Sequence, residues 1–193
     1  MSDEDAGRST VTAAADAAGS GVDAGAEVSE SASDASNTTG DRGIDELRTV
    51  ADYQFGAGAG NALFPPDEDI DIHRSSSGRP RQLVAAEGRL VSYGVDGRFT
   101  LGVAGGRRLA AAFEAPRCRV VVGDESEPFV REGKNAFAKF VTDVDPEIRS
   151  GDEVLVVHAR GDLLAVGRAE LSADGMADFD SGMAVKVREG VDD

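Results

Sequence analysis

Short runs of β-branched residues, separated by glycine and aspartate, crowd the last third of this 193-residue chain. β-Branched residues favour strands, whereas glycine and aspartate favour the turns between strands. The predicted strands are residues 119–122, 135–141, 151–157, 163–171 and 184–188. Short helices at 128–132 and 172–179 and a single helical turn at 145–149 fit between them. This many strands in about 70 residues predicts an α+β pseudo-barrel.

The preceding segment, residues 43–115, carries a different pattern. Leu47, Val50 and Ala51 recur at helical spacing, and a glycine-rich run ends that helix. The Asp96–Gly97 pair lies between two apolar runs and suits the positive φ of a tight hairpin turn. The predicted strands here are residues 82–85, 89–93 and 99–103. The segment is therefore predicted to pack one or two helices on a small antiparallel sheet.

The first 42 residues are predicted to form a disordered acidic tail. Within the first 40 residues eight acids accompany one base, and the larger apolar side chains are three valines. Such a stretch buries too little apolar surface to offset the entropy of ordering. A leader translated from a misplaced start codon is an alternative origin. The chain shows neither a secretory signal nor an apolar run of membrane-spanning length, so we expect a cytoplasmic protein without a membrane partner.

The formal net charge of −16 by itself argues against nucleic-acid binding. The basic residues are 17 arginines and three lysines, and this scarcity of lysine among many acids resembles proteins of halophilic archaea. In molar salt the Debye length is about 3 Å, so local clusters matter more than net charge. Between residues 73 and 117 eight arginines outnumber three acids. These arginines either bind phosphate or pair with acids elsewhere on the surface.

The last third resembles the PUA domain, an RNA-binding pseudo-barrel. The resemblance is carried by residues 117–122, 127–141, 151–157, 163–168 and 184–190. Residues 43–115 resemble the small domain that precedes PUA in archaeal tRNA-guanine transglycosylases and archaeosine synthases. That second resemblance is carried by residues 51–56, 63–65, 77–79, 96–101 and 108–109. The tandem order implies a pre-PUA α+β domain at 43–115, a PUA domain at 116–190, and tRNA or another structured RNA as partner.

The PUA resemblance implies an RNA-binding face made by the first helix, the glycine-led segment after it and the last strand. Mapped onto this chain, the face consists of Arg131, Gly133, Lys134, Asn135, Ala136, Lys139, Lys186 and Arg188. All three lysines of the chain fall in this set. The aromatic and aliphatic neighbours are expected in the core: Phe137, Phe140, Val185 and Val187. A second RNA-binding surface is expected at Arg79, Arg81, Arg107 and Arg108.

Transglycosylase chemistry requires parts that this sequence lacks. The catalytic (β/α)₈ barrel needs on the order of 250 residues, and one cysteine with two separated histidines cannot build the family's zinc site. We expect a non-catalytic protein, without cofactor or metal, that binds the tRNA acceptor stem and CCA end in support of the archaeosine pathway. A catalytic tRNA-modification enzyme in trans is the expected protein partner.

Three other features allow rival interpretations. The alternative function is a ribosome- or enzyme-associated interaction subunit that docks through exposed Phe55, Leu63 and Phe64. His158 near Asp162 has the composition of an acid–base pair, but a surface histidine is the commoner case. The acidic run ahead of His73 is expected to be a solvated loop rather than a cation site.

Overall fold

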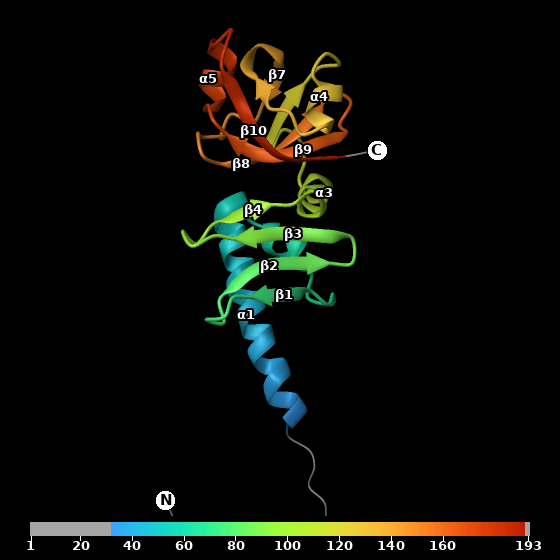
Figure 1. Cartoon of the computed structure of the whole chain (residues 1–193), viewed down its shortest axis with the longest axis vertical. Helices are drawn as coiled ribbons and strands as arrows, with labels where there is room; N and C mark the ends of the chain where they lie inside the picture. The colour runs from blue at the N-terminus through green and yellow to red at the C-terminus, as the bar shows by residue number, and fades with distance from the viewer. Residues whose placement is uncertain (1–31, 192–193) are drawn as a thin grey trace, which may run out of the picture.

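The computed structural model describes residues 32–191, which form two units stacked along the long axis of the molecule (Figure 1). The elements of the first unit are α1 (Ala32–Phe55), α2 (Ala59–Leu63), β1 (Asp71–Arg74), β2 (Pro80–Ala85), β3 (Gly88–Tyr93), β4 (Phe99–Leu101) and α3 (Val103–Ala112). Those of the second are β5 (Arg119–Val122), α4 (Glu127–Arg131), β6 (Ala136–Phe137), the 3₁₀ helix η1 (Ala138–Phe140), β7 (Val141–Val144), β8 (Glu153–His158), β9 (Leu163–Ala169), α5 (Ala173–Asp178) and β10 (Met183–Gly190).

The first unit is an antiparallel sheet in the order β1-β2-β3-β4 with helices on one face. Leu83, Val91 and Leu101 lie opposite one another on neighbouring strands, and all three are buried. The predicted hairpin turn is confirmed, because Gly97 has a φ of +77° between β3 and β4. Helix α2 packs so closely on α1 that a Cβ at Gly60 would lie 2.5 Å from the Arg48 carbonyl oxygen. Glycine at this position permits the approach of the two backbones.

The second unit is a six-stranded, nearly closed pseudo-barrel in the order β6-β10-β9-β8-β5-β7. The β5–β8 pair is parallel and the other neighbours are antiparallel. Every residue of β8 is buried, as expected for a strand with both faces covered. The helix predicted at 172–179 is present as α5, and the Ser172 hydroxyl caps its start by accepting from the Gly175 amide at 3.3 Å. The predicted pseudo-barrel is therefore confirmed.

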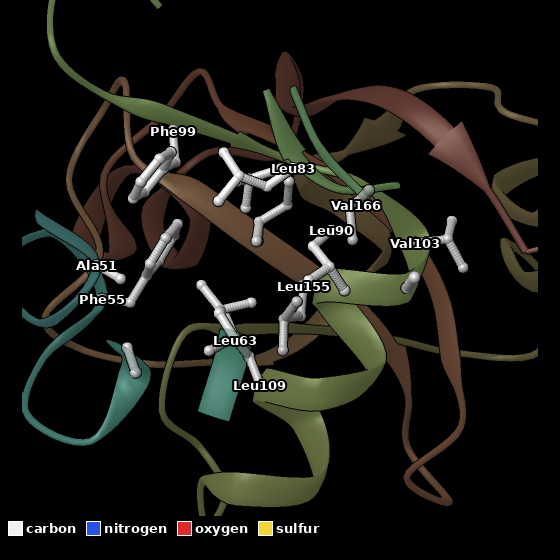
Figure 2. Packing of buried hydrophobic residues seen from close by; sticks show 14 of the residues in the cluster. Ala51, Phe55, Leu63, Leu83, Leu90, Phe99, Val103, Leu109, Leu155 and Val166 are labelled. Carbon is white, nitrogen blue, oxygen red and sulfur yellow. The ribbon is translucent and has the colours of Figure 1, made fainter. Parts of the chain in front are cut away.

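The two units share one apolar core (Figure 2). Leu155 and Val166 of the barrel lie in the same buried cluster as Leu90 and Leu109 of the first unit. Helix α3 lies between the units, and a Cβ at Gly106 would be 2.5 Å from the Val166 side chain. Because this packing leaves no space for a larger residue, α3 fixes the barrel against the first sheet.

Two buried charged side chains also join elements of both units. The Arg119 guanidinium donates to the carbonyl oxygens of Ala110 and Phe113, both at 2.7 Å, and to that of Arg117 at 3.2 Å. The Glu153 carboxylate accepts from the Leu101 amide at 3.0 Å and pairs with Arg188. Burial raises the pKa of Glu153, against the opposing effect of Arg188. Glu153 thus connects β4 of the first unit to β8 and β10 of the barrel.

Several local predictions were wrong. Residues 135–141 form β6, η1 and the start of β7 rather than one strand, because the chain turns at the 3₁₀ helix. Residues 145–149 contain one hydrogen-bonded turn, in which the Ile148 amide donates to the Asp145 carbonyl oxygen at 3.1 Å, rather than a helical segment. The acidic run ends in the edge strand β1, and residues from Val103 onward form α3.

The apolar residues proposed as a docking surface are interior: Phe55, Leu63 and Phe64 are at most 4% exposed. They pack between α1, α2 and the sheet in the shared core. These residues are therefore not available as a docking surface.

Within residues 32–191, no helix is long and apolar enough to cross a membrane. Residues 1–31 of the predicted tail lie outside those described. Helix α1 begins at Ala32, within the predicted tail, rather than at the start of the segment 43–115. Adding a residue to a helix that is already formed costs much less free energy than starting a new helix.

Candidate nucleic-acid interface

The three lysines lie on adjoining parts of the barrel. Lys134 follows α4, Lys139 lies in η1, and Lys186 lies on β10, which pairs with β6. All three residues are exposed. Lys186 alternates with buried Val185 and Val187, so its side chain points outward from the strand. The predicted set of lysines is therefore presented by neighbouring elements, and we call α4, residues 133–139 and β10 the lysine face.

The turn after α4 brings exposed backbone to this face. Gly133 has a φ of +82°, and a Cβ there would meet nothing within 4 Å. Its amide donates to the Val130 carbonyl oxygen at 2.9 Å, which closes the end of α4. Asn135 Oδ1 accepts from the Val187 amide at 3.1 Å. Asn135 therefore holds the glycine-led segment against β10, and its oxygen is engaged within the protein.

Two phenylalanines on the lysine face are exposed. Phe129 is 59% exposed and Phe137 is 43% exposed, although large apolar side chains normally lie inside. The prediction that Phe137 belongs to the core was wrong, because β6 is an edge strand with a single neighbour. Phe140 is half-buried beneath the Lys139 ammonium, which lies 4.5 Å from the ring centroid. Lysines beside exposed aromatic rings match the needs of phosphate contact and base stacking.

Four of the predicted RNA-binding residues are engaged inside the protein. Ala136 is 1% exposed. Arg131 donates to Glu127 at 3.1 Å, and Arg188 pairs with the buried Glu153. Arg108 pairs with Glu68 and with Glu87. A backbone hydrogen bond and the hydrogen bond from Arg108 lower the pKa of the Glu87 carboxyl. Ala136 therefore belongs to the core, and the three arginines stabilise the fold through ion pairs within the protein.

Two further groups of arginines in the first unit bear on the candidate surfaces. Arg89 pairs with Glu189 and Arg98 with Asp152, so both link the first unit to the barrel. Arg79 and Arg81 on the β1–β2 hairpin and Arg107 on α3 are exposed, and no ion pair engages them among the described residues. Three of the four predicted cations are therefore exposed, two on the β1–β2 hairpin and one on α3, and their use as a second RNA-binding surface stays a prediction.

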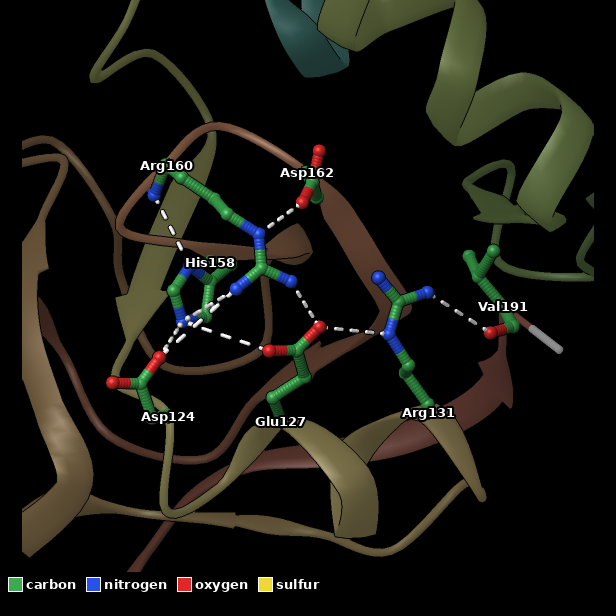
Figure 3. A network of polar contacts seen from close by, with 7 residues as sticks. All are labelled: Asp124, Glu127, Arg131, His158, Arg160, Asp162 and Val191. Carbon is green, nitrogen blue, oxygen red and sulfur yellow. Dashed lines mark hydrogen bonds and ion pairs between the residues drawn. The ribbon is translucent and has the colours of Figure 1, made fainter. Parts of the chain in front are cut away.

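His158 lies in a charge network beside α4 (Figure 3). Its Nε2 lies 3.0 Å from Asp124 Oδ1, and its Nδ1 accepts from the Arg160 amide at 3.2 Å. The Arg160 guanidinium pairs with Glu127 and Asp162, and its hydrogen bond lowers the pKa of Glu127. The partner predicted for His158 was Asp162, but Arg160 takes that carboxylate. The network fixes the start of α4 against the β8–β9 turn and thereby positions the lysine face.

The cluster of Asp124, Glu127 and His158 has metal-ligand chemistry, since one ligand atom from each lies within 4.8 Å of the others. The Arg160 guanidinium, however, already donates to Glu127 and lies 3.3 Å from His158 Nε2. That cation satisfies the charge that a metal would otherwise balance, so the arrangement is that of a structural ion cluster.

Cys118 is expected to be an inert thiol. Burial raises its pKa to about 11, with the Asp145 carboxylate adding to the effect, so about one thiol in a thousand is ionised at pH 8. Iodoacetamide alkylation of the native protein at pH 8 should therefore be far slower than that of the urea-unfolded chain. The native rate should rise about tenfold per pH unit below the pKa, because the thiolate is the nucleophile. Equal rates in the native and unfolded states would contradict this placement of Cys118.

Comparisons with known proteins agree with the two-unit architecture. Residues 45–116 match the model of the patch-forming domain C2 of tRNA-guanine transglycosylase, and residues 118–191 match that of the PUA domain. The chain is 46% identical over 149 residues to the tRNA-guanine(15) transglycosylase of Methanothermobacter thermautotrophicus, covering 76% of this chain and 22% of the relative. It is 44% identical over 156 residues to that of Pyrococcus furiosus, covering 80% and 26%. The chain thus spans about a quarter of the length of these curated relatives.

Two solved structures share the fold. A hypothetical protein from Pyrococcus horikoshii superposes with a TM-score of 0.64 at 22% identity, covering 79% of this chain and 92% of that one. A conserved PUA domain protein from Thermoplasma acidophilum superposes with a TM-score of 0.56 at 20% identity, covering 78% and 91%. Both cover the first unit as well as the barrel, so the tandem arrangement recurs in other chains.

Proposed function

Because this chain carries a C2 domain and a PUA domain that resemble the C-terminal part of archaeal tRNA-guanine(15) transglycosylases, we propose that it binds tRNA. The observation that carries the proposal is the lysine face, whose elements expose Lys134, Lys139 and Lys186 together with Phe129 and Phe137. In a chain of net charge −16 these are all the lysines present. Their exposure on adjoining elements of the barrel supports a phosphate-binding role for this part of an otherwise acidic protein.

The chemistry of the lysine face favours a junction of paired and unpaired RNA. Ammonium groups neutralise backbone phosphates of either form, but an aromatic ring stacks on a base that is free of its helix. In tRNA the acceptor stem and its single-stranded CCA end supply this combination. The protein would thus hold tRNA by that end in the cytoplasm, without a reaction or cofactor of its own. It would present the tRNA to a modification enzyme of the archaeosine pathway in trans.

Removal of the 3′ CCA tests which end is held. The affinity of the full chain for a tRNA transcript is measured by filter binding, with and without the three terminal nucleotides, at one salt concentration. We expect the truncated tRNA to bind about tenfold more weakly, because stacking contributes ~1–3 kcal/mol per base. A hairpin RNA of equal length with a blunt end serves as the control. Equal affinity for the three RNAs would contradict selection of the CCA end.

A further inference from the structure

The open face of the first sheet contains a groove of about 430 Å³. It is lined by His73, Arg81, Gln82, Ser92 and Thr100, and by residues 93–95 at the end of β3 and in the turn after it. Helix α1 crosses the opposite side of the sheet, behind the four strands in Figure 1. The groove therefore lies away from the shared core, on a surface of the C2 unit separate from the lysine face.

The strand register explains why this face is polar. His73 lies opposite Gln82, Gln82 opposite Ser92, and Ser92 opposite Thr100, so one polar side chain comes from each strand. Opposite residues of antiparallel strands point to the same face. The adjacent register row, Ile72, Leu83, Val91 and Leu101, packs in or against the core. The sheet is thus apolar toward the helices and carries a continuous polar row in the groove.

Two groups in the groove have unused hydrogen-bonding capacity. Among residues 32–191 no hydrogen bond or ion pair engages the side-chain amide of Gln82 or the guanidinium of Arg81. The Ser92 hydroxyl, in contrast, accepts from Arg89 at 3.1 Å, and His73 Nε2 lies 3.0 Å from Asp71. A free amide offers one acceptor and two donors, and a free guanidinium offers a planar fork of donors to an anion.

We propose that this groove holds one unpaired nucleotide of a bound RNA, an inference that rests on the RNA binding proposed above. Gln82 reads the edge of the base, and Arg81 contacts a flanking phosphate. The groove volume lies at the lower end of the ~300–1,000 Å³ usual for pockets that bind one small molecule. Base edges are accessible to an amide when the nucleotide is unstacked and unpaired. The exposed Arg79 on the same hairpin extends the positive charge along the RNA backbone.

Photo-crosslinking from the groove rim tests the inference on the full chain. Val95 lines the groove and is 86% exposed, so p-benzoylphenylalanine can replace it with little effect on folding. The protein is irradiated with a tRNA transcript and, separately, with hexauridylate and hexaadenylate, and crosslinked nucleotides are mapped by reverse-transcription stops. We expect stops at one unpaired site of tRNA. We also expect at least about a fivefold loss of crosslink yield in Arg81→Glu with Gln82→Leu. Arg149→Glu, an exposed charge reversal outside the groove, should leave the yield unchanged.

The outcomes separate this inference from the tRNA proposal. If tRNA binds but the Val95 position gives no crosslink, or crosslinks scattered over paired nucleotides, the groove inference is overturned and tRNA binding stands. If tRNA does not bind but the hexamers crosslink in an Arg81- and Gln82-dependent manner, the groove inference stands and the tRNA proposal falls. Absence of crosslinks to every RNA overturns the groove inference.

Discussion

Reversing the charge of all three lysines, Lys134→Glu, Lys139→Glu and Lys186→Glu together, is expected to weaken tRNA binding by at least about 100-fold. Each substitution removes an exposed cation from the lysine face and adds repulsion toward phosphate. The remaining surface cannot compensate, because the chain is already strongly acidic. The salt dependence of the affinity should fall by about 0.9 in log–log slope for each lost phosphate contact. Fluorescence anisotropy with labelled tRNA at several salt concentrations measures both quantities.

A single reversal at Arg149 is the matched control, because this arginine is exposed in a turn outside the lysine face. Arg149→Glu should change the affinity by less than about twofold, since long-range charge effects are screened by salt. Circular dichroism would establish that the triple variant retains its fold. A folded triple variant with wild-type affinity would show that the lysine face does not bind tRNA.

Replacing Arg119 by methionine is expected to lower the free energy of unfolding by about 3–5 kcal/mol. Arg119 is 9% exposed, and its guanidinium satisfies three carbonyl oxygens in the chain leading from α3 into β5. Methionine fills much of the same volume but leaves these acceptors without their donors. Because the carbonyls belong to the segment that joins the two units, the loss should destabilise both together.

Urea denaturation followed by circular dichroism measures this change, with one cooperative transition expected for wild type and variant. Arg149→Met is the control, and an exposed substitution of this kind usually changes stability by less than about 0.5 kcal/mol. A loss below about 1 kcal/mol for Arg119→Met would show that water satisfies the three carbonyls instead. Two separate transitions would argue against the shared core.

Strands with a strong local signal were predicted well, and polar or short ones were not. The valines of β5 and the Asp96–Gly97 turn have single local interpretations, and the structure contains both. Strand β1 was missed because Asp71–Arg74 forms a polar edge whose pairing with β2 is a tertiary effect. The burial of Arg119 was also missed. An arginine at the start of a strand resembles a surface residue, because the carbonyl oxygens that surround it come from α3 and the segment after it.

The candidate site shows the same limit. Lysine scarcity and family resemblance indicated Lys134, Lys139 and Lys186, and the structure places them on neighbouring exposed elements. The exposure of Phe129 and Phe137 could not be predicted, because the apolar character of a phenylalanine by itself predicts burial. Their exposure depends on where α4 and β6 lie in the folded barrel. The pairing of Arg108 with two glutamates that lie 40 and 21 residues away could not be read from local sequence.

The most direct test of the central claim is an anisotropy titration of the unmodified chain against a tRNA transcript between about 0.1 and 1 M salt, with a blunt hairpin RNA as competitor. We expect saturable binding to tRNA that weakens steeply with salt, with a log–log slope corresponding to about three phosphate contacts. We also expect the hairpin to compete poorly, because its blunt end offers no unpaired 3′ bases to stack on Phe129 and Phe137. Absence of saturable binding at the lowest salt would contradict tRNA binding by this chain. Equal competition by the hairpin would contradict its preference for an unpaired 3′ end.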